Sequence, residues 1–585
     1  MTRDAETAAM ELLDSRRLTG PGLVLDRPGA VADIRVADDR RDELIAAWRD
    51  AATRMLAAVG WVGERVVAHR FTGGASLAIT APPDSLYSAT ELNEWAWAAA
   101  VAAARRVPEP KFGAAAERLR QAIAGERNPA LLAIRSAARS RGLTFLSGER
   151  LVSIGAGTGV LCWPASELPP PGRIDWSRAH EIPVALVTGS NGKTTVVRLL
   201  AAMAAAAGRV TGVTSTEGVL VRGVPVAEGD YSGPEGARLA LRRAEVDTAI
   251  LETARGGLLR CGLTVERADV AVVTNIAADH LGEFGVQDLR QLGDTKLLVA
   301  RAIGPGGRVV LNADDPVLVE AAAAVRAPIV WFSLDAGNAV IGRHTAGGGA
   351  AVVVDGDALV LATGSEREVV ARVADMPLAS GGAARHNVAN ALAATAAAGG
   401  LGIPLDVVRA TLCRFGRDPA DNPGRANVYQ IGGIRIVVDY AHNPHGMAAL
   451  AATLDALPSE RRLVMIGQAG DRDDAAIREL ARAALALRPD RVVVKEMDAY
   501  LRGRAPGEVP ALMADELRRA GVPEHAISVP GTEIPAVREA LAWARPGDLL
   551  VLMLHQDRRR VEELLETLRR RGWHAGEPLD APLSS

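Results

Sequence analysis

The sequence predicts an α/β protein: a P-loop central domain with a doubly wound sheet, an α/β Rossmann-like C-terminal domain, and a smaller α+β N-terminal domain. Three observations carry this prediction. After about residue 180, short apolar runs alternate with helix-forming segments; several runs end in polar residues; and one run leads directly into a glycine- and lysine-containing loop and an alanine-rich helix. Short buried strands that alternate with helices are typical of parallel sheets, whose ligands gather at the carboxyl ends of the strands.

Three regions divide the 585 residues. Residues 1–180 mix short strands with alanine-rich helices and end in the proline-rich linker 168–172, which indicates a boundary. Residues 181–415 are expected to form the central domain, and residues 416–585 the C-terminal domain. The predicted strands of these two domains are at residues 183–187, 246–252, 268–275, 308–312, 434–438, 463–466, 491–494 and 549–552.

The loop after the strand at 183–187 predicts a phosphate-binding site. It reads Thr-Gly-Ser-Asn-Gly-Lys-Thr-Thr over residues 188–195. Glycines let backbone N–H groups face an anion, and the following helix adds its positive end. The alternative is a structural glycine turn, because Val187 stands where the longer P-loop pattern has a glycine. The expected nucleotide-binding residues of the loop are Gly189, Ser190, Asn191, Gly192, Lys193, Thr194 and Thr195.

Lysine is scarce in this chain. Only four of the 67 basic residues are lysines, so arginine is the default cation. An amine can lose its proton and react, whereas a guanidinium stays protonated. Lys193 and Lys296 are therefore candidates for chemistry that arginine cannot perform, with chance retention as the alternative.

Composition excludes several function classes. The net charge is −3 and the arginines are interspersed with acidic residues, so no basic stripe predicts nucleic-acid binding. No apolar stretch approaches the roughly 20 residues needed to span a bilayer, and the N-terminus lacks an apolar targeting segment. Three widely spaced cysteines are interpreted as reduced core thiols, and the expected compartment is the cytoplasm.

Polar residues at neighbouring strand ends predict a metal site beside the loop. Glu252 closes one predicted strand, Asn275 closes the next, and His280 follows in a short loop. A carboxylate oxygen and the Thr194 hydroxyl suit Mg²⁺, and a histidine is an unusual extra ligand. The alternatives are a solvated acid for Glu252 and a helix-capping role for His280.

Ordered motifs give the chain a resemblance to the Mur ligase superfamily. The motifs are residues 188–195, Glu252, 274–276 with 279–281, 312–316, 385–387 with Asn390, and 439–444. Within that superfamily the chain most resembles the Mur-type C-terminal half of cyanophycin synthetases. The segments that carry this closer likeness are 233–234, 251–258, 495–496, 502–504 and 507–508.

The N-terminal region is also similar to the first domain of cyanophycin synthetases, through Arg17–Pro21 and Thr90–Trp95. Those enzymes carry an ATP-grasp domain between the two parts. Here the segment near residue 155 runs directly into the linker and the P-loop, so the resemblance implies that this second ligase domain is missing.

The resemblance implies ATP-dependent amide-bond formation through an acyl phosphate, which an amine then attacks. It implies that Lys193 binds the β- and γ-phosphates and that Thr194 and Glu252 hold one Mg²⁺. His280 and Lys296 would hold a second Mg²⁺, with Lys296 carbamylated by CO₂. Only a lysine can undergo that conversion.

The same resemblance places the remaining ATP contacts. It implies that Asn275 lies at the nucleotide, that adenine lies near His386, Asn387 and Asn390, and that Arg425 and Asp439 close on the phosphate and ribose. Closure of the domains would exclude water from the acyl phosphate.

The substrates are expected to be a small-molecule or peptide carboxylate and an amino-acid amine, such as arginine joined to an acidic acceptor. The candidate substrate residues are Arg255, His442, Asn443, Lys495, Glu496, Arg502 and Arg504. The segment 495–504 has a solvated loop as its alternative. The alternative function is an accessory or non-catalytic subunit beside a separate ATP-grasp or cyanophycin synthetase partner, and a homo-oligomer is a further partner hypothesis.

Overall fold

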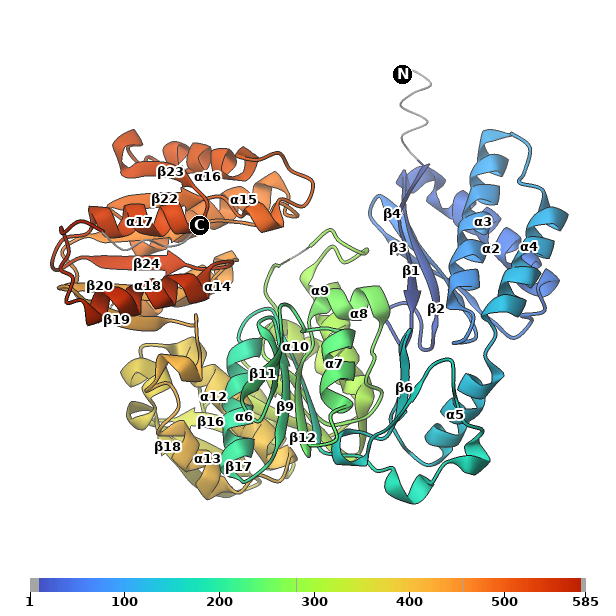
Figure 1. Cartoon of the computed structure of the whole chain (residues 1–585), viewed down its shortest axis with the longest axis horizontal. Coiled ribbons are helices and arrows are strands. Elements are labelled where there is room, and N and C mark those ends of the chain that lie inside the picture. Colours follow the sequence, from blue (N-terminus) through green and yellow to red (C-terminus); the bar gives the residue numbers. More distant parts are fainter. Residues whose placement is uncertain (1–9, 280, 456, 580–585) are drawn as a thin grey trace. The chain divides into compact units, whose positions relative to one another are not determined.

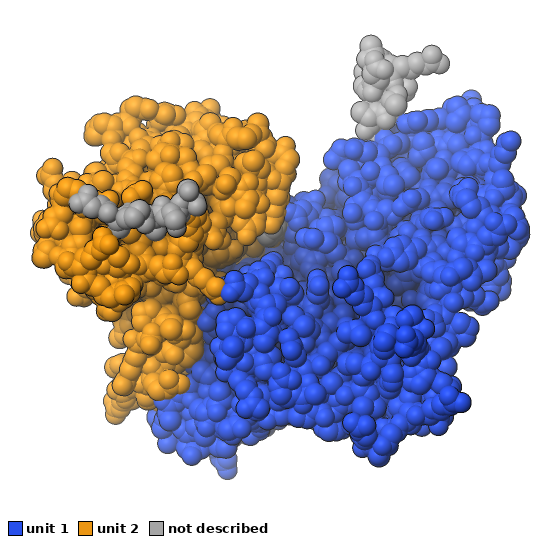
Figure 2. All heavy atoms as spheres, in the orientation of Figure 1, with its two compact units in different colours: residues 1–276, 281–370, 391–411 blue, residues 277–280, 371–390, 412–585 orange. Residues whose placement is uncertain are grey.

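The computed structural model describes residues 10–279, 281–455 and 457–579. The chain divides into two compact units. Unit 1 comprises residues 1–276, 281–370 and 391–411, and unit 2 comprises residues 277–280, 371–390 and 412–585 (Figure 2). We describe each unit by itself, and the division into three domains stays a prediction.

Unit 1 begins with a four-stranded antiparallel sheet of order β1-β2-β4-β3, which helices α2 and α3 cover (Figure 1). Asn93 ties the layers together because it accepts a hydrogen bond from the Trp48 indole at 2.9 Å and donates one to the Leu77 carbonyl at 2.9 Å. The elements are β1 (Met10–Leu18), β2 (Gly29–Val36), α2 (Asp38–Ala58), β3 (Val66–Phe71), β4 (Gly74–Thr80), α3 (Leu86–Arg105), α4 (Phe112–Glu126), α5 (Pro129–Ser140) and a small sheet of β5 (Phe145–Ser147), β6 (Leu151–Ile154) and β7 (Leu161–Pro164).

An eleven-stranded sheet forms the rest of unit 1, in the order β11-β10-β9-β12-β8-β13-β14-β15-β16-β17-β18. Its centre, from β9 to β16, is parallel, and hairpins add the antiparallel strands at its edges. The strands are β8 (Val184–Thr188), β9 (Thr211–Ser215), β10 (Gly218–Val221), β11 (Val224–Glu228), β12 (Thr248–Glu252), β13 (Ala268–Val273), β14 (Ile303–Asn312), β15 (Ile329–Ser333), β16 (Ala350–Asp355), β17 (Ala358–Thr363) and β18 (Glu366–Arg372).

Helices cover this sheet. Those that bear on the site are α6, which packs against β9 and β12, and α8, which packs against β1 and α9. The helices are α6 (Lys193–Ala206), α7 (Pro234–Leu241), α8 (Arg255–Cys261), α9 (Leu289–Lys296), α10 (Pro316–Ala321), α11 (Ala339–Ala346), α12 (Arg385–Gly400), which begins in unit 2, and α13 (Leu405–Leu412).

Unit 2 contains a six-stranded sheet of order β19-β20-β24-β21-β22-β23. All neighbours pair in parallel except β19, which pairs antiparallel with β20. The elements are β19 (Asn427–Ile431), β20 (Ile434–Asp439), α14 (Pro444–Leu454), β21 (Arg462–Ile466), α15 (Asp474–Ala484), β22 (Arg491–Lys495), α16 (Glu508–Arg519), β23 (Ile527–Gly531), α17 (Glu533–Trp543), β24 (Leu549–Met553) and α18 (Arg558–Arg570).

The structure contains a strand at each of the eight positions predicted for the two α/β regions, which confirms the doubly wound arrangement. The prediction of core thiols was wrong. All three cysteines are free, but Cys162 is exposed on β7 and the other two are half-buried. No helix in the described ranges is both long and apolar enough to cross a membrane.

Candidate active site

The predicted phosphate loop connects the buried strand β8 to helix α6, and two glycines allow its path. Gly189 has φ 148°, and a Cβ there would lie 1.8 Å from the Thr274 hydroxyl oxygen. Gly192 has φ 85° and directly precedes the first helical residue, Lys193. Because a side chain would clash at the first position and strain the backbone at both, glycine is required there.

The end of β13 holds this loop in place. Asn275 accepts a hydrogen bond from the Asn191 backbone N–H at 3.0 Å and donates one to the Asn191 carbonyl at 3.1 Å. The Thr274 hydroxyl donates to the same carbonyl at 2.6 Å, and the Ser190 N–H donates to the Asn275 carbonyl at 2.9 Å. The loop conformation is therefore fixed by a neighbouring strand of the same sheet.

Two oxygen groups meet beside the loop. The Thr194 hydroxyl donates a hydrogen bond to a Glu252 carboxylate oxygen at 2.9 Å, and both side chains are buried. Glu252 arrives there because β12 pairs in parallel with β8 and ends at the same edge of the sheet. A hydroxyl and one carboxylate fit Mg²⁺, which is usually bound by one or two carboxylates together with nucleotide phosphates and water. Lys193 donates to the Ser190 carbonyl at 3.3 Å, which places its ammonium at the loop.

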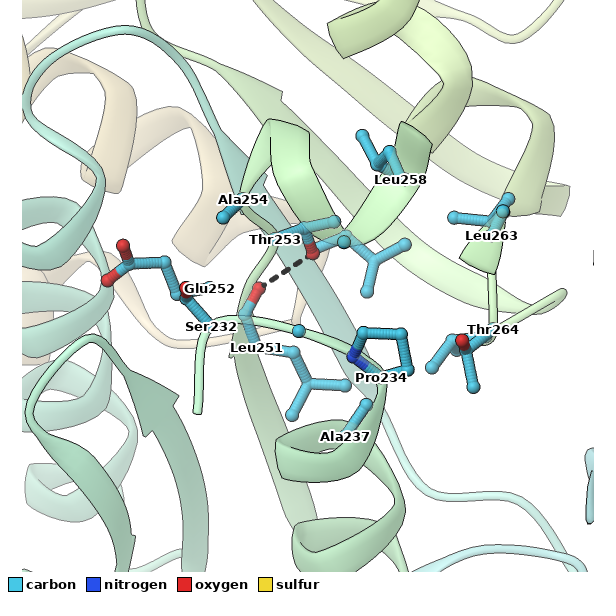
Figure 3. Close-up of a pocket in the computed structure, with 15 residues that line it drawn as sticks. Ser232, Pro234, Ala237, Leu251, Glu252, Thr253, Ala254, Leu258, Leu263 and Thr264 are labelled. Atoms are coloured by element: carbon cyan, nitrogen blue, oxygen red, sulfur yellow. Dashed lines mark hydrogen bonds between the residues drawn. The ribbon is translucent and has the colours of Figure 1, made fainter. Parts of the chain in front are cut away.

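A small cavity lies on the other side of the Glu252 strand. It measures about 30 Å³, room for little more than a water molecule, and is lined by β12, α7, α8 and the segment 262–265. The Glu252 carboxylate points away from apolar lining residues such as Pro234 and Leu258 (Figure 3). The cavity lies between this strand and the packed helices, and Glu252 is the residue that it shares with the phosphate site.

The second predicted metal site is described only in part. Lys296 is the last residue of α9 and is 4% exposed. His280 lies outside the described residues. The pairing of these two residues around a metal stays a prediction.

The predicted adenine residues lie together at the start of α12. The Asn390 amide donates to the Asn387 side-chain oxygen at 3.2 Å, and Asn387 donates to the Leu378 carbonyl at 3.2 Å. Burial lowers the pKa of His386. The nearby His445 lowers this pKa further, whereas the Asp439 carboxylate raises it. A neutral imidazole beside two amides suits an uncharged base.

Arg425 and Asp439 also lie in unit 2. Asp439 accepts hydrogen bonds at 2.7 Å from the backbone N–H groups of Ala426 and Ala441, so it fixes the turn that follows β20. The Arg425 guanidinium lies 4.5 Å from the centre of the Tyr440 ring, where a cation–π interaction holds it.

The candidate substrate residues fall into groups. In unit 1, Arg255 is buried at the start of α8 and forms an ion pair with Glu283. In unit 2, His442 lies 3.8 Å from an Asp279 carboxylate oxygen, and Asn443 caps α14 by accepting from the Gly446 N–H at 2.8 Å.

The segment after β22 holds the remaining candidates. Arg502 pairs with Asp471, and Arg504 pairs with Asp474 at 2.8 Å and with Glu508 at 2.6 Å. The Glu496 carboxylate accepts a hydrogen bond from the Gly507 N–H. Each of these three candidates therefore has a partner in the segments 471–474 or 507–508, and their role at a substrate stays a prediction.

Lys495 is the most deeply buried of the candidate substrate residues. It is 0% exposed and forms an ion pair with Glu533, which is equally buried. Glu533 also accepts hydrogen bonds from the backbone N–H groups of residues 555–557. Glu533 therefore holds the Lys495 ammonium in this structure, and a role of Lys495 at a substrate stays a prediction.

Sequence reasoning missed two residues beside this pair. Tyr440 packs edge-on against the His555 ring, with ring centres 4.9 Å apart. Burial lowers the pKa of His555 well below its usual value, and Lys495 and His442 add to that effect. His555 directly follows Leu554 at the carboxyl end of β24, so the strand-end rule that selected Glu252 would have found it.

A glycine–lysine loop between a buried parallel strand and a helix, beside a hydroxyl and a carboxylate, defines a nucleotide-binding α/β protein of the P-loop class. The Mur ligase middle domain matches residues 187–398, and the Mur ligase glutamate ligase domain matches residues 424–553. The chain belongs to the Mur ligase family. This family consists of ATP-dependent carbon–nitrogen ligases.

Individual relatives agree with this assignment. Cyanophycin synthetase from Synechocystis sp. is 37% identical over 371 residues, which are 63% of this chain and 42% of that protein. UDP-N-acetylmuramoylalanine–D-glutamate ligase from Pelotomaculum thermopropionicum is 31% identical, over 63% of this chain and 69% of the relative. The chain thus spans about two fifths of the length of the cyanophycin synthetases it matches.

Among solved structures, E. coli FolC in complex with DHPP and ADP is 23% identical, with a TM-score of 0.48, over 66% of this chain and 89% of that one.

Proposed function

We propose that this protein joins an amino-acid amine, such as that of arginine, to the carboxylate of an acidic amino acid or peptide. The carboxylate is first phosphorylated by ATP to an acyl phosphate, and the amine then displaces the phosphate. The observation that supports this proposal most directly is the Thr194–Glu252 pair beside a loop that Asn275 fixes. The likeness to cyanophycin synthetases supports the choice of substrate class.

In this proposal the residues of unit 1 neutralise and orient phosphate. Lys193 and the backbone N–H groups of the loop bind the β- and γ-phosphates, and Thr194 and Glu252 hold one Mg²⁺. When bound, Mg²⁺ neutralises charge on the transferring phosphoryl group. Lys296, with His280, is the proposed site of a second Mg²⁺, for which carbamylation would convert an amine into an oxygen ligand.

The residues of unit 2 are proposed to hold the rest of the nucleotide and the amine. His386, Asn387 and Asn390 bind adenine, because a half-buried imidazole with a lowered pKa and two amides can hydrogen-bond an uncharged base. Arg425 and Asp439 bind phosphate and ribose.

The proposed substrate residues come from both units. Arg255 faces the acceptor carboxylate, while the surroundings of the amine are formed by His442, Asn443, Lys495, Glu496, Arg502 and Arg504. This ordering follows charge: a guanidinium suits an acid, and the carboxylates near Arg502 and Arg504 suit a basic amine.

The test is a screen of carboxylate and amine pairs for ADP release, with mass spectrometry of the products. An amide product that requires both substrates, and that is lost in Lys193→Ala, is the expected result. Steady ATP hydrolysis that no amino acid or peptide changes, without amide product, would contradict the proposal.

A second candidate is an accessory subunit that works beside an ATP-grasp partner. The observation that favours it is the match to only about two fifths of each cyanophycin synthetase. Amide formation that appears only when a separate ATP-grasp protein is added would support this candidate.

A further inference from the structure

The sequence segment Arg17–Pro21, which has no part in the ATP chemistry, lies against the helix that follows Glu252. The Thr19 backbone N–H donates to the Cys261 carbonyl at 2.8 Å, and the Leu263 N–H donates to the Pro21 carbonyl at 2.6 Å. These two main-chain bonds join the end of β1 to the end of α8, and the Thr19 hydroxyl donates to the same Cys261 carbonyl at 3.2 Å.

Two glycines permit this close approach. A Cβ on Gly20 would lie 2.0 Å from the Leu263 carbonyl oxygen. A Cβ on Gly262, which has φ 75°, would lie 2.3 Å from the Gly20 carbonyl oxygen. The two backbones are therefore in direct contact, and any side chain at Gly20 must push α8 away.

The Arg16 side chain adds further interactions next to this backbone contact. Its guanidinium pairs with Asp33 at 2.5 Å and donates to the Leu259 carbonyl at 2.9 Å, in the last turn of α8. It also lies 4.9 Å from the centre of the Phe284 ring. A cation at a helix C-terminus and over an aromatic face is favourable in both places. Arg16 thus holds α8 and the loop 281–288 at once.

The N-terminal sheet also contacts the C-terminal end of the loop 281–288. The Thr72 N–H donates to the Gln287 side-chain oxygen at 2.9 Å, and the Gln287 amide donates to the Thr72 carbonyl at 2.7 Å. Gly285, with φ 75°, packs so closely on Phe71 that a Cβ would lie 2.9 Å from the ring. Within the loop, Glu283 forms the ion pair with Arg255 of α8.

We infer that the N-terminal sheet is a positioning element for the ligase site. It fixes α8 and the loop 281–288 relative to β12, and so sets where the Arg255–Glu283 pair stands. The inference rests on the proposed function in one respect, the assignment of the acceptor carboxylate to Arg255. Arg16, Gly20 and Gln287 are positioning residues that touch no reacting atom.

Gly20→Ala tests the inference without altering any residue of the site. Gly63→Ala is the matched control, because it makes the same change in the N-terminal region where no atom lies within 4 Å of the new Cβ. Hydrogen–deuterium exchange is expected to become about tenfold faster in residues 255–263 and 281–288 of Gly20→Ala, the response to losing one or two hydrogen bonds. Exchange in β8 and α6 should stay unchanged.

Steady-state kinetics supplies the second readout. KM for the carboxylate substrate should rise about tenfold or more in Gly20→Ala, because small misplacements of a positioning group are costly, while KM for ATP should stay within about twofold. Gln287→Ala leaves the glycine contact intact and should also raise KM for the carboxylate substrate. This variant keeps the inference testable if Gly20→Ala does not fold.

Exchange and KM values equal to those of Gly63→Ala would overturn the inference. If the wild-type protein makes no amide product, the proposed function fails, but the exchange measurement still decides whether the N-terminal sheet holds α8 and the loop.

Discussion

Asn275 exchanges two hydrogen bonds with the backbone of Asn191, at 3.0 and 3.1 Å, and so fixes the phosphate loop from the neighbouring strand. A side chain that we propose for nucleotide contact thereby also shapes the loop. A nucleotide bound at this loop would meet N–H groups that are already oriented, which reduces the entropy lost on binding.

Asn275→Ala is therefore expected to raise the Kd for ATP by about tenfold, the effect of losing one or two net hydrogen bonds. Isothermal titration calorimetry with ATP and Mg²⁺ measures it. Asn338→Ala is the control, since the Asn338 side chain caps α11 and bonds to Ala313 and Asp314 instead of the loop. An unchanged Kd in Asn275→Ala would show that the loop keeps its conformation without this side chain.

Glu252→Gln should retain the hydrogen bond from Thr194 but remove the negative charge. We expect the Mg²⁺ concentration for half-maximal activity to rise about tenfold or more, because Mg²⁺ depends on carboxylate ligands, with little loss of thermal stability. Glu320→Gln, an exposed position on α10, is the matched control. Equal Mg²⁺ dependence in the two variants would argue against Glu252 as a ligand.

Strand-end reasoning predicted that Glu252 and Asn275 lie beside the phosphate loop, and the structure places both there. The rule selected Glu252, which ends β12, and Asn275, which follows β13; Lys495, which came from the resemblance, also ends a parallel strand. It cannot tell whether such a side chain faces a ligand or a countercharge. For Lys495 that countercharge is Glu533, which lies 38 residues further along the chain. No local sequence pattern predicts this ion pair.

The docking of the N-terminal sheet was equally hidden from the sequence. Gly20 and Gly262 look like ordinary turn residues, and their requirement appears only when two segments more than 200 residues apart meet. Periodicity and motifs predict elements and local sites, whereas contacts between distant backbones depend on how the elements pack.

His555 predicts how stability depends on pH. Its folded pKa lies well below the usual value of 6.5, chiefly because burial disfavours the charged ring. The unfolded chain therefore binds more protons between the folded pKa and pH 6.5. Stability is fully present above pH 6.5 and falls as the pH drops, by up to about 1.4 kcal/mol per pH unit for one histidine.

His555→Asn should reduce the pH dependence of the free energy of unfolding between pH 6.5 and 5. Urea denaturation and hydrogen exchange in α17 and β24 measure this free energy. His574→Asn is the control because His574 is exposed. A slope that is the same in both variants would mean that His555 does not remain neutral in the folded protein.

Lys296 offers the sharpest test of the proposed second metal site. Lys296→Arg keeps a positive charge but cannot present carbamate oxygens, so we expect turnover to fall about 10²-fold or more, as when a positioned charge-stabilising group is removed. Lys296→Ala should be similarly inactive and should recover part of its turnover with a short-chain carboxylic acid that fills the vacated position. Lys111→Arg is the control, because it makes the same change at an exposed site before α4 and should leave turnover unchanged. Full activity of Lys296→Arg would exclude the carbamate, because a guanidinium has no route to an oxygen ligand.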